Sequence, residues 1–267
     1  MVLKVGVHGA GGRMGRTVVQ LVHEAEDMKL AAAVDAEGSP LLGRDAGELA
    51  GVPALGVPVS ARIEELASAD VIVDFSLPLA LPRLFAFLEQ RALPLVVATT
   101  GLDAVLGARI DALARAMPLI AAPNYSTGVA VLYHLAEKAA ALLPDFDLEI
   151  LEMHHRHKVD APSGTALGLL DAAARGREVD GRELAVFGRQ GHTGARSERE
   201  IGVMTLRGGD VFGDHTLMLA GPGERLELTH RASSRALFAR GALRAARFVA
   251  VQKPGRYSMP QVLGLAP

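Results

Sequence analysis

A glycine-rich turn near the start of the chain limits the fold more than any other feature. Gly9, Gly12 and Gly15 lie between an alternating apolar segment at residues 2–8 and a helical pattern at residues 13–26. Such glycines allow a tight strand-to-helix turn, let backbone N–H groups approach a pyrophosphate, and let the helix pack on the strand. Asp35 follows a second apolar segment, where a carboxylate can bind a ribose diol. The pattern predicts a dinucleotide-binding unit; the alternative is a glycine turn without ligand, with Asp35 as a helix cap or solvated acid.

The rest of the chain falls into two patterns of secondary structure. Short apolar strands alternate with helices as far as residue 122, which indicates parallel pairing in a doubly wound sheet. From about residue 148, four strand-like segments are separated mainly by short turns, which indicates an open mixed sheet. We therefore predict an α/β fold: a Rossmann-type doubly wound parallel sheet plus a second α+β domain with an open mixed sheet. Residues 176–199 are polar, with Gly188, Gly191 and Gly194 among them, and are predicted to form a mobile loop.

Composition limits the classes of function. The 267 residues have a net charge of −2, only 4% aromatic residues and no cysteine. This composition gives no reason to expect nucleic acid as a partner, and it rules out disulfides, thiolate nucleophiles and cysteine-bound metals. No apolar run approaches the roughly 20 residues that span a bilayer, and the N-terminus does not resemble a signal peptide. The expectation is a soluble cytoplasmic protein of about two domains.

The end of the second strand bears on the choice of cofactor. The Asp35 carboxylate can accept hydrogen bonds from a ribose 2′-OH and would repel a 2′-phosphate, and Ala36 stands where an Arg could have bound that phosphate. NADH is therefore predicted to be preferred over NADPH, although Arg13 leaves NADPH as a usable cofactor. Thr99 and Thr100, which follow another strand, are candidates to contact the nicotinamide side; simple loop capping is the alternative.

The densest group of reactive side chains lies at residues 152–166. His154, His155 and Lys158 follow a predicted strand, and a Pro-Ser-Gly-Thr turn then opens a helix. Backbone N–H groups at Gly164 and Thr165, with the Thr165 hydroxyl, can bind a carboxylate at the helix start. Imidazole and ammonium groups can bind anions or transfer protons near neutral pH. Alternating strand faces let both imidazoles share a pocket only if the strand ends between them.

Two other interpretations of this histidine group remain. His154, His155 and His157 could bind a metal, or the group could be a solvated basic face. Ser163 is an unconvincing nucleophile, because the G-x-S-x-G elbow is absent; helix capping is the role that its position favours.

The two motifs together resemble a known family. The loop Gly-Ala-Gly-Gly-Arg-Met-Gly and the block Glu-x-His-His-x-x-Lys-x-Asp-Ala-Pro-Ser-Gly-Thr-Ala are similar to those of the 4-hydroxy-tetrahydrodipicolinate reductases, also called dihydrodipicolinate reductases, of diaminopimelate and lysine biosynthesis. The resemblance extends over the whole chain. It implies NAD(P)H-dependent reduction of a cyclic dicarboxylate and a homotetramer joined through the open sheets.

The resemblance also implies a role for individual residues and a domain division. His154 and Lys158 would be the proton-transferring catalytic residues, and His155, Gly164 and Thr165 would bind the substrate. The cofactor would be bound by Gly9, Ala10, Gly11, Gly12, Arg13, Met14, Asp35, Ala98, Thr99, Thr100, Ala122, Pro123, Asn124 and Tyr125. Ala98 departs from the glycine that is common in the family. Residues 1–125 and 236–267 would form the dinucleotide-binding domain, and residues 126–235 the substrate-binding and oligomerisation domain.

Three rival functions are compatible with parts of the sequence. A different two-domain amino- or hydroxy-acid dehydrogenase would explain the glycine turn but not the block at 152–166. A metal-dependent hydrolase would need carboxylate ligands beside the histidines. A non-catalytic NAD(H) sensor would have no need for the His-Lys block.

Overall fold

The computed structural model of the protein describes residues 2–265 and separates into two compact units. The first unit contains the residues up to Ser126 and those from Ala236 onward; the second is Thr127–Arg235. Among the described residues, no helix is both long enough and apolar enough to cross a membrane. The roles assigned above to the two domains, nucleotide binding and substrate binding, stay predictions at this point.

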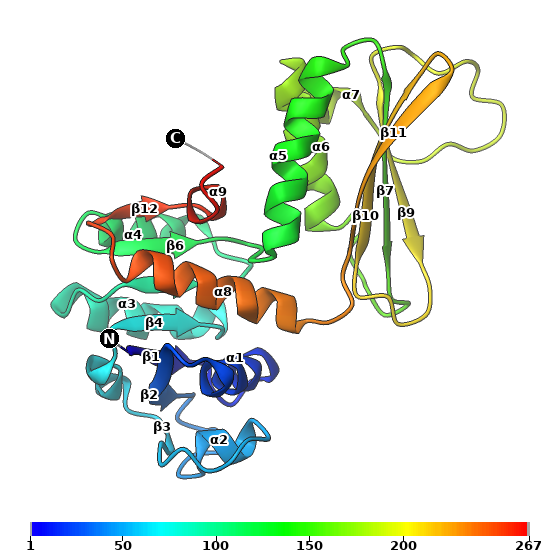
Figure 1. Ribbon diagram of the computed structural model, residues 1–267. Coiled ribbons are helices and arrows are strands. Elements are labelled where there is room, and N and C mark those ends of the chain that lie inside the picture. The colour runs from blue at the N-terminus through cyan, green and yellow to red at the C-terminus, as the bar shows by residue number, and fades with distance from the viewer. Residues whose placement is uncertain (1, 266–267) are drawn as a thin grey trace. The chain divides into compact units, whose positions relative to one another are not determined.

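The first unit is built on a seven-stranded sheet in which every neighbouring pair is parallel (Figure 1). The strand order is β12-β6-β5-β4-β1-β2-β3, so the order reverses next to β1, which is where doubly wound sheets bind ligands. The strands are β1 (Leu3–His8), β2 (Met28–Val34), β3 (Val59–Ser60), β4 (Val71–Asp74), β5 (Leu95–Val97), β6 (Pro118–Ala121) and β12 (Gly255–Tyr257).

Helices cover both faces of this sheet. The helical elements of the unit are α1 (Arg13–Glu24), α2 (Ala46–Leu49), η1 (Ile63–Ser68), η2 (Pro78–Ala80), α3 (Leu81–Gln90), α4 (Ala104–Ala114), α8 (Ala236–Val249) and α9 (Met259–Val262). α3 and α4 pack on one face, where Phe85 and Ile110 meet Ile72 and Val97 of the strands. α1 and α8 pack against each other on the opposite face (Figure 1). Strands buried on both sides explain the continuous apolar runs of the sequence.

A single carboxylate organises much of the long segment between β2 and β3. Asp45 accepts hydrogen bonds from the backbone N–H groups of Gly47, Glu48, Leu55, Gly56 and Val57. The hydrogen bond from the Leu55 N–H makes the largest contribution to lowering the pKa of Asp45. Desolvation opposes this effect, but the backbone hydrogen bonds together hold the pKa below its ordinary value. The short helix α2 begins at this cap.

The second unit is a five-stranded mixed sheet with helices on one face (Figure 1). The strand order is β11-β10-β7-β9-β8; β10 is antiparallel to both of its neighbours, whereas β7, β9 and β8 are parallel. The strands are β7 (Asp147–His154), β8 (Ala185–Val186), β9 (Ile201–Arg207), β10 (Asp214–Gly221) and β11 (Glu224–Arg231), and the helices are α5 (Thr127–Leu142), α6 (Gly164–Arg177) and α7 (Gly181–Leu184).

Burial alternates along β7, the central strand. Leu148 and Ile150 pack against α5 and α6, and Glu152 and His154 continue the same buried face toward the end of the strand. Two apolar residues and two ionisable residues thus share one face of one strand. The strand therefore carries core packing at its start and chemical groups at its end.

The expectation of a mobile loop at 176–199 is wrong for residues 176–186, whereas residues 187–199 contain no helix or strand. α6 continues to Arg177, and α7 and β8 follow it. Arg189 and Arg196 then bind Glu149 on β7, with Nη2 of Arg189 2.6 Å and Nε of Arg196 3.0 Å from its Oε1. These ion pairs join residues 40 and 47 positions apart in the chain, which a reading of local composition does not reveal.

Candidate active site

The glycine turn of the first unit has the backbone geometry that the sequence predicts. Gly9 has φ +81°, and its N–H donates to the carbonyl of Val34 at 2.8 Å. A Cβ at Gly9 would lie 2.8 Å from the Phe75 carbonyl oxygen, and a Cβ at Gly15 would overlap the Gly9 carbonyl oxygen. Both positions therefore require glycine, the first for backbone conformation and close approach, the second for packing of α1 on β1.

The start of α1 is suited to an anion. The helix has 12 residues, its N-cap is Gly12 without a side-chain cap, and its first turn contains no acidic residue. The N–H groups at its N-terminus therefore keep unscreened positive partial charge. A Cβ at Gly11 would overlap the Asp35 carboxylate, which accepts a hydrogen bond from the Ser39 hydroxyl at 2.9 Å. Bare backbone beside a carboxylate fits a dinucleotide.

The other candidate residues of this turn differ in exposure. Ala10 is buried and its N–H donates to the Val34 carbonyl, so any contact with a ligand would come from its backbone. Arg13 opens α1 and is exposed, and Met14 is half-buried.

A fully buried carboxylate lies at the neighbouring strand end and is absent from the sequence-based site. Asp74 accepts from the Thr99 hydroxyl at 2.7 Å and from the Ser76 hydroxyl at 2.6 Å, and His8 Nδ1 lies 2.7 Å away. The Thr99 hydroxyl is therefore engaged within the protein, whereas Thr100 is exposed. The N–H of Ala98 donates to the Asp74 carbonyl. The sequence pattern that could have indicated this site is an acidic residue, Asp74, at the end of an otherwise apolar strand.

Tyr125 is a core residue. It is 2% exposed, and its hydroxyl donates to the carbonyls of Val97 and Ile120 at 2.8 and 3.1 Å. Burial raises the pKa of its phenol well above the ordinary value. The Tyr125 carbonyl oxygen also touches α8 so closely that a Cβ at Gly241 would overlap it. Side-chain contacts to a cofactor from this segment would have to come from Ala122, Pro123 and Asn124, which are half-buried or exposed.

In the second unit, His154 is bound by a buried carboxylate. Its Nδ1 lies 2.6 Å from Oε2 of Glu152, which has no solvent exposure. Arg207 on β9 donates to both oxygens of the same carboxylate, at 2.9 and 3.1 Å. Burial favours a higher pKa for Glu152, but the hydrogen bonds from Arg207, His154 and Ser163 outweigh it and hold the pKa below its usual value. Desolvation lowers the pKa of His154 despite the opposing effect of Glu152, which favours a neutral imidazole near pH 7.

The remaining basic residues diverge after the strand. β7 ends at His154, and the N–H of His155 already donates to the Val211 carbonyl at 2.7 Å, outside the strand. Lys158 donates to both carboxylate oxygens of Asp160, at 2.7 and 2.9 Å, and this hydrogen bond lowers the pKa of Asp160. His157 is exposed, with its ring centroid 6.3 Å from that of His155. Within residues 2–265 no cluster of three or more His, Cys, Asp and Glu side chains has the arrangement of a metal site.

The N-terminus of α6 lies beside these groups. Ser163 is the N-cap, its hydroxyl accepts from the Ala166 N–H at 3.2 Å, and its own N–H donates to Glu152. Gly164 is exposed with open space around its Cα, Thr165 is half-buried, and the first turn has no acidic residue. The helix start therefore presents backbone N–H groups and a positive partial charge to an anion, next to the strand end that carries His154.

A second imidazole lies against the first and is absent from the sequence-based site. His215 on β10 is 4% exposed, its Nε2 is 3.0 Å from the Ser163 hydroxyl, and its ring centroid is 5.1 Å from that of His154. Desolvation, with a further contribution from His154, lowers its pKa to about 4. His215 is therefore neutral throughout the physiological range. Register between β7 and β10, which pairs His215 with Glu152, brings these residues together.

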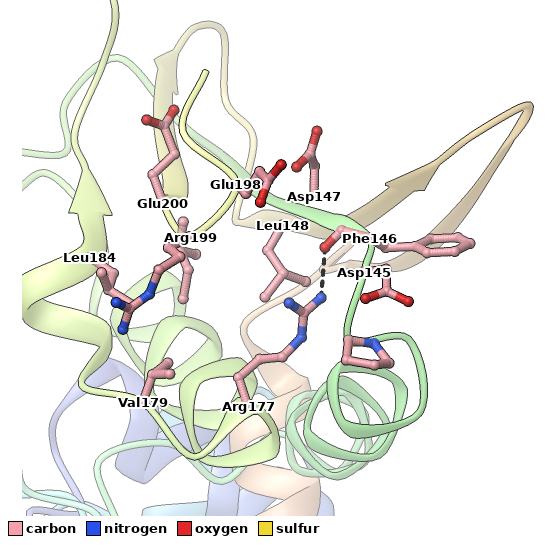
Figure 2. A pocket seen from close by; sticks show the side chains of 12 residues that line it. Asp145, Phe146, Asp147, Leu148, Arg177, Val179, Leu184, Glu198, Arg199 and Glu200 are labelled. Atoms are coloured by element: carbon pink, nitrogen blue, oxygen red, sulfur yellow. Dashed lines mark hydrogen bonds between the residues drawn. The ribbon is translucent and has the colours of Figure 1, made fainter. Parts of the chain in front are cut away.

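A separate cavity of about 490 Å³ lies at the other end of β7 (Figure 2). Arg177 forms part of its wall, and its guanidinium donates to the carbonyls of Ala140, Leu143 and Phe146 at 2.8, 2.7 and 2.6 Å. Because α5 ends at Leu142, these bonds satisfy carbonyl groups at and just beyond a helix C-terminus. Within this cavity Arg177 is a structural cap.

Comparison with known proteins gives a consistent result over the whole chain. Residues 3–125 match the model described as "Dihydrodipicolinate reductase, N-terminus", and residues 128–263 match "Dihydrodipicolinate reductase, C-terminus". The chain belongs to the dihydrodipicolinate reductase family. It is therefore a pyridine-nucleotide-dependent oxidoreductase with a Rossmann-type domain, and the predicted fold class is confirmed.

Individual relatives agree with this membership. The 4-hydroxy-tetrahydrodipicolinate reductase of Thiobacillus denitrificans is 52% identical, and that of Alkalilimnicola ehrlichii 51%, each over 99% of this chain and 100% of the relative. A solved dihydrodipicolinate reductase from Paenisporosarcina sp. TG-14, described as dipicolinate-bound, matches with a TM-score of 0.75 and 26% identity over 96% of this chain and 97% of that one.

Proposed function

We propose that this protein reduces 4-hydroxy-tetrahydrodipicolinate to tetrahydrodipicolinate in diaminopimelate and lysine biosynthesis. The observation that carries the proposal is the group of His154, Lys158 and the N-terminus of α6 in the second unit, in a chain whose relatives bear that enzyme name. The test is the decrease in absorbance at 340 nm with freshly prepared aldol product of pyruvate and aspartate semialdehyde. Absence of turnover with both NADH and NADPH would contradict the proposal.

The substrate is a ring dicarboxylate, and the second unit has groups that suit it. The N–H groups of Gly164 and Thr165 lie at a helix start whose first turn contains no acidic residue, where a carboxylate is favoured. His155 follows directly after the strand end and provides an imidazole for the same anion. The Paenisporosarcina relative binds dipicolinate, a planar ring dicarboxylate, which supports this assignment. Isothermal titration with dipicolinate tests it: we expect weaker binding after Thr165→Val and unchanged binding after Thr229→Val on β11.

The two proposed catalytic residues differ in their resting charge. The lowered pKa of His154 favours a neutral ring near pH 7, whereas Lys158 is an ammonium donor paired with Asp160. Lys158 is therefore the group that enters the reaction already carrying a proton to give. His154 accepts or returns a proton at Nε2, since Nδ1 is engaged with Glu152.

Substitution of either residue tests this division. General acid–base help is worth about 10²–10⁴-fold in rate. We expect His154→Gln and Lys158→Ala to lower kcat within that range, with the Kd of the cofactor little changed. Near-normal turnover in both variants would contradict the assignment.

The first unit binds the cofactor. Its diphosphate is held by the backbone from Gly9 to Met14, where the bare glycines and the uncapped start of α1 leave N–H groups available. The adenosine ribose is held by Asp35. The nicotinamide side is lined by Ala98, Thr99 and Thr100 and by Ala122, Pro123, Asn124 and Tyr125, with Thr99 and Tyr125 contributing through their backbone. When bound, the reduced nicotinamide supplies a hydride, and a proton from the protein completes the reduction as one water is lost from the substrate.

NADH is the preferred cofactor. Asp35 places a carboxylate beside Gly11, and the nearby Arg83 guanidinium is already bound to Glu37, with Nη1 2.8 Å from Oε1. A 2′-phosphate would therefore meet the negative charge of Asp35, while Arg83 is already paired and only the exposed Arg13 is left to offset that charge. The expected kcat/KM is higher with NADH than with NADPH, and Ala36→Arg is expected to reduce the difference. A clear NADPH preference in the unchanged protein would contradict this proposal.

The protein acts as a homotetramer in the cytoplasm. The face of the five-stranded sheet opposite α5 and α6 carries partly exposed apolar side chains, including Met153, Met204, Leu206 and Met218. An uncovered apolar sheet face is suited to a second copy of the same surface. Light scattering after size exclusion tests this, and a monomer at micromolar concentration would contradict it.

A further inference from the structure

The carboxylate of Glu152 has more hydrogen-bond donors than any other carboxylate near the candidate site. Oε1 accepts from the Ser163 N–H at 3.0 Å, from the Thr205 hydroxyl at 3.2 Å and from Nη2 of Arg207 at 3.1 Å. Oε2 accepts from Nη1 of Arg207 at 2.9 Å and lies 2.6 Å from Nδ1 of His154. The side chain has no solvent exposure. A carboxylate so surrounded by donors is held as an anion, because a proton on either oxygen would displace one of them.

An anionic Glu152 leaves only one arrangement for His154. A carboxylate without a proton can only accept, so Nδ1 of His154 must be the donor in the 2.6 Å contact. The neutral ring then has its lone pair on Nε2. That nitrogen points toward Gly213, where a Cβ would lie 2.8 Å from it, so only a residue without a side chain leaves it accessible.

Arg207 in turn is fixed by the backbone. Its Nη2 donates to the Asp160 carbonyl at 2.7 Å and its Nη1 to the Leu206 carbonyl at 2.6 Å. The parallel register pairs Arg207 with His154 across β7 and β9, which sets the guanidinium beside the Glu152 carboxylate. Three side chains from two strands therefore form a chain of contacts that ends at the imidazole.

We propose that Glu152 is a positioning residue, with Arg207 as its partner, that fixes the Nδ1–H tautomer of His154 and keeps Nε2 as the proton acceptor of the reaction. This inference deepens the proposed function and rests on the role given there to His154. It adds that the reaction requires the negative charge of Glu152 and not only the shape of its side chain.

The elements next to the imidazole carry several charged or titratable groups. They are Glu152 on β7, Arg207 on β9, Asp214 and His215 on β10, His230 on β11, and His155, His157, Lys158 and Asp160 in the turn after β7. Of these, Glu152 raises the pKa of His154, whereas Lys158 and Arg207 lower it. Removal of Glu152 or of Arg207 should therefore move the titration of His154 in opposite directions.

The first experiment uses the unchanged protein. Nitrogen-15 NMR of the histidine side chains distinguishes Nδ1–H from Nε2–H rings in the absence of substrate. The expected result for His154, assigned by comparison with His154→Gln, is the Nδ1–H form at pH 7.5. A predominant Nε2–H form would overturn the proposal, and His154→Gln is needed only to assign the resonances.

The second experiment measures pH profiles of kcat/KM for Glu152→Gln, Arg207→Gln and Arg207→Lys. Glu152→Gln is expected to lower kcat on the order of 10²-fold and to move the limb that His154→Gln abolishes to lower pH. Arg207→Gln should move that limb to higher pH. Arg207→Lys keeps the charge and should restore the limb toward its normal position. A purely structural role would lower activity without moving the limb, and that outcome would overturn the proposal.

A matched control comes from an exposed ion pair in the same unit. Arg175 on α6 and Glu137 on α5 lie 3.1 Å apart at the surface, and Glu137→Gln and Arg175→Gln should leave both kcat and the pH limb unchanged. The activity of His154→Gln distinguishes a failure of the proposed function of His154 from a failure of the positioning role of Glu152. Normal turnover in His154→Gln would overturn the proposed function of that residue, whereas an impaired His154→Gln beside an unshifted Glu152→Gln would overturn only the positioning role.

Discussion

Replacement of Gly213 by alanine tests whether Nε2 of His154 takes part in the reaction. Gly213 immediately precedes β10 and has φ +155°. A Cβ there would lie 2.8 Å from Nε2 of His154 and 3.3 Å from Cδ2 of His154 and from Cε1 of His215. Ordinary contacts between carbon and nitrogen are near 3.5 Å, so either the backbone or the imidazole must shift by several tenths of an ångström.

Two costs follow from this geometry. The backbone conformation is one that residues with a Cβ rarely adopt, which costs on the order of 1–3 kcal/mol of stability. The methyl group also covers the nitrogen and displaces the ring, and misplacement of a catalytic group by about 1 Å can cost about 10²-fold in rate. We therefore expect Gly213→Ala to lower kcat by about 10–10²-fold, with the Kd of NADH unchanged because the proposed nucleotide site lies in the other unit.

A second glycine in the same turn provides the control. Gly209 has φ +53°, and a Cβ there would meet nothing within 4 Å. Gly209→Ala should therefore lose about 1–2 kcal/mol of stability from left-handed strain and keep normal kcat. Steady-state kinetics and urea unfolding of the two variants distinguish the effects. If Gly213→Ala loses stability as Gly209→Ala does but keeps kcat within about threefold, Nε2 of His154 is not a reacting atom.

Three further predictions concern stability. Arg177→Met should lower the free energy of unfolding by about 2–4 kcal/mol, because three carbonyl groups lose a charged donor, and a Tm within about 2 °C of normal would contradict this. Asp74→Asn should cost about 2–4 kcal/mol, since His8, Thr99 and Ser76 all bond to this buried carboxylate; urea unfolding checks it, with exposed Asp111→Asn as the comparison. The pKa of His215 is about 4 in the folded protein, below its ordinary value of 6.5. As the pH falls, the unfolded chain therefore binds a proton at this residue before the folded protein does, and the free energy of unfolding decreases below about pH 6.5. The loss should reach about 2 kcal/mol between pH 7.5 and pH 5, and urea unfolding of His215→Asn should lack this component.

The regular elements were predictable because local sequence determines them. The strand–turn–helix at residues 3–24 follows from an apolar strand, three spaced glycines and a helical apolar pattern, and the structure has β1 and α1 there. β3 and β8, by contrast, have two residues each and β12 has three, which is too short for any periodicity to be seen. They exist because a neighbouring strand offers a free edge, and that information lies elsewhere in the chain.

Local sequence could place some residues of the candidate site on one face, but it could not identify their contact partners. Alternation along β7 is enough to place Glu152 and His154 on the same face, since they are two residues apart. The contact with Arg207 depends on the parallel register of β7 with β9, across 55 positions of sequence, and the contact with His215 depends on β10. Register is set by the packing of whole sheets, so no local pattern announces these partners.

The position of Glu152 is itself an argument for function. Leu148 and Ile150 precede it on the buried face of β7, and a further apolar residue would complete the packing against α6 without desolvating a charge. Burying an ion pair typically gains little stability, and replacing one by apolar residues of similar size often gains about 1–4 kcal/mol. A strand selected for stability alone would therefore favour leucine at 152. The proposed role of holding Nε2 of His154 as the proton acceptor explains the presence of the carboxylate, its arginine and the adjacent imidazole. We therefore expect a Glu152→Leu, Arg207→Leu double variant to fold with higher stability but to lack turnover.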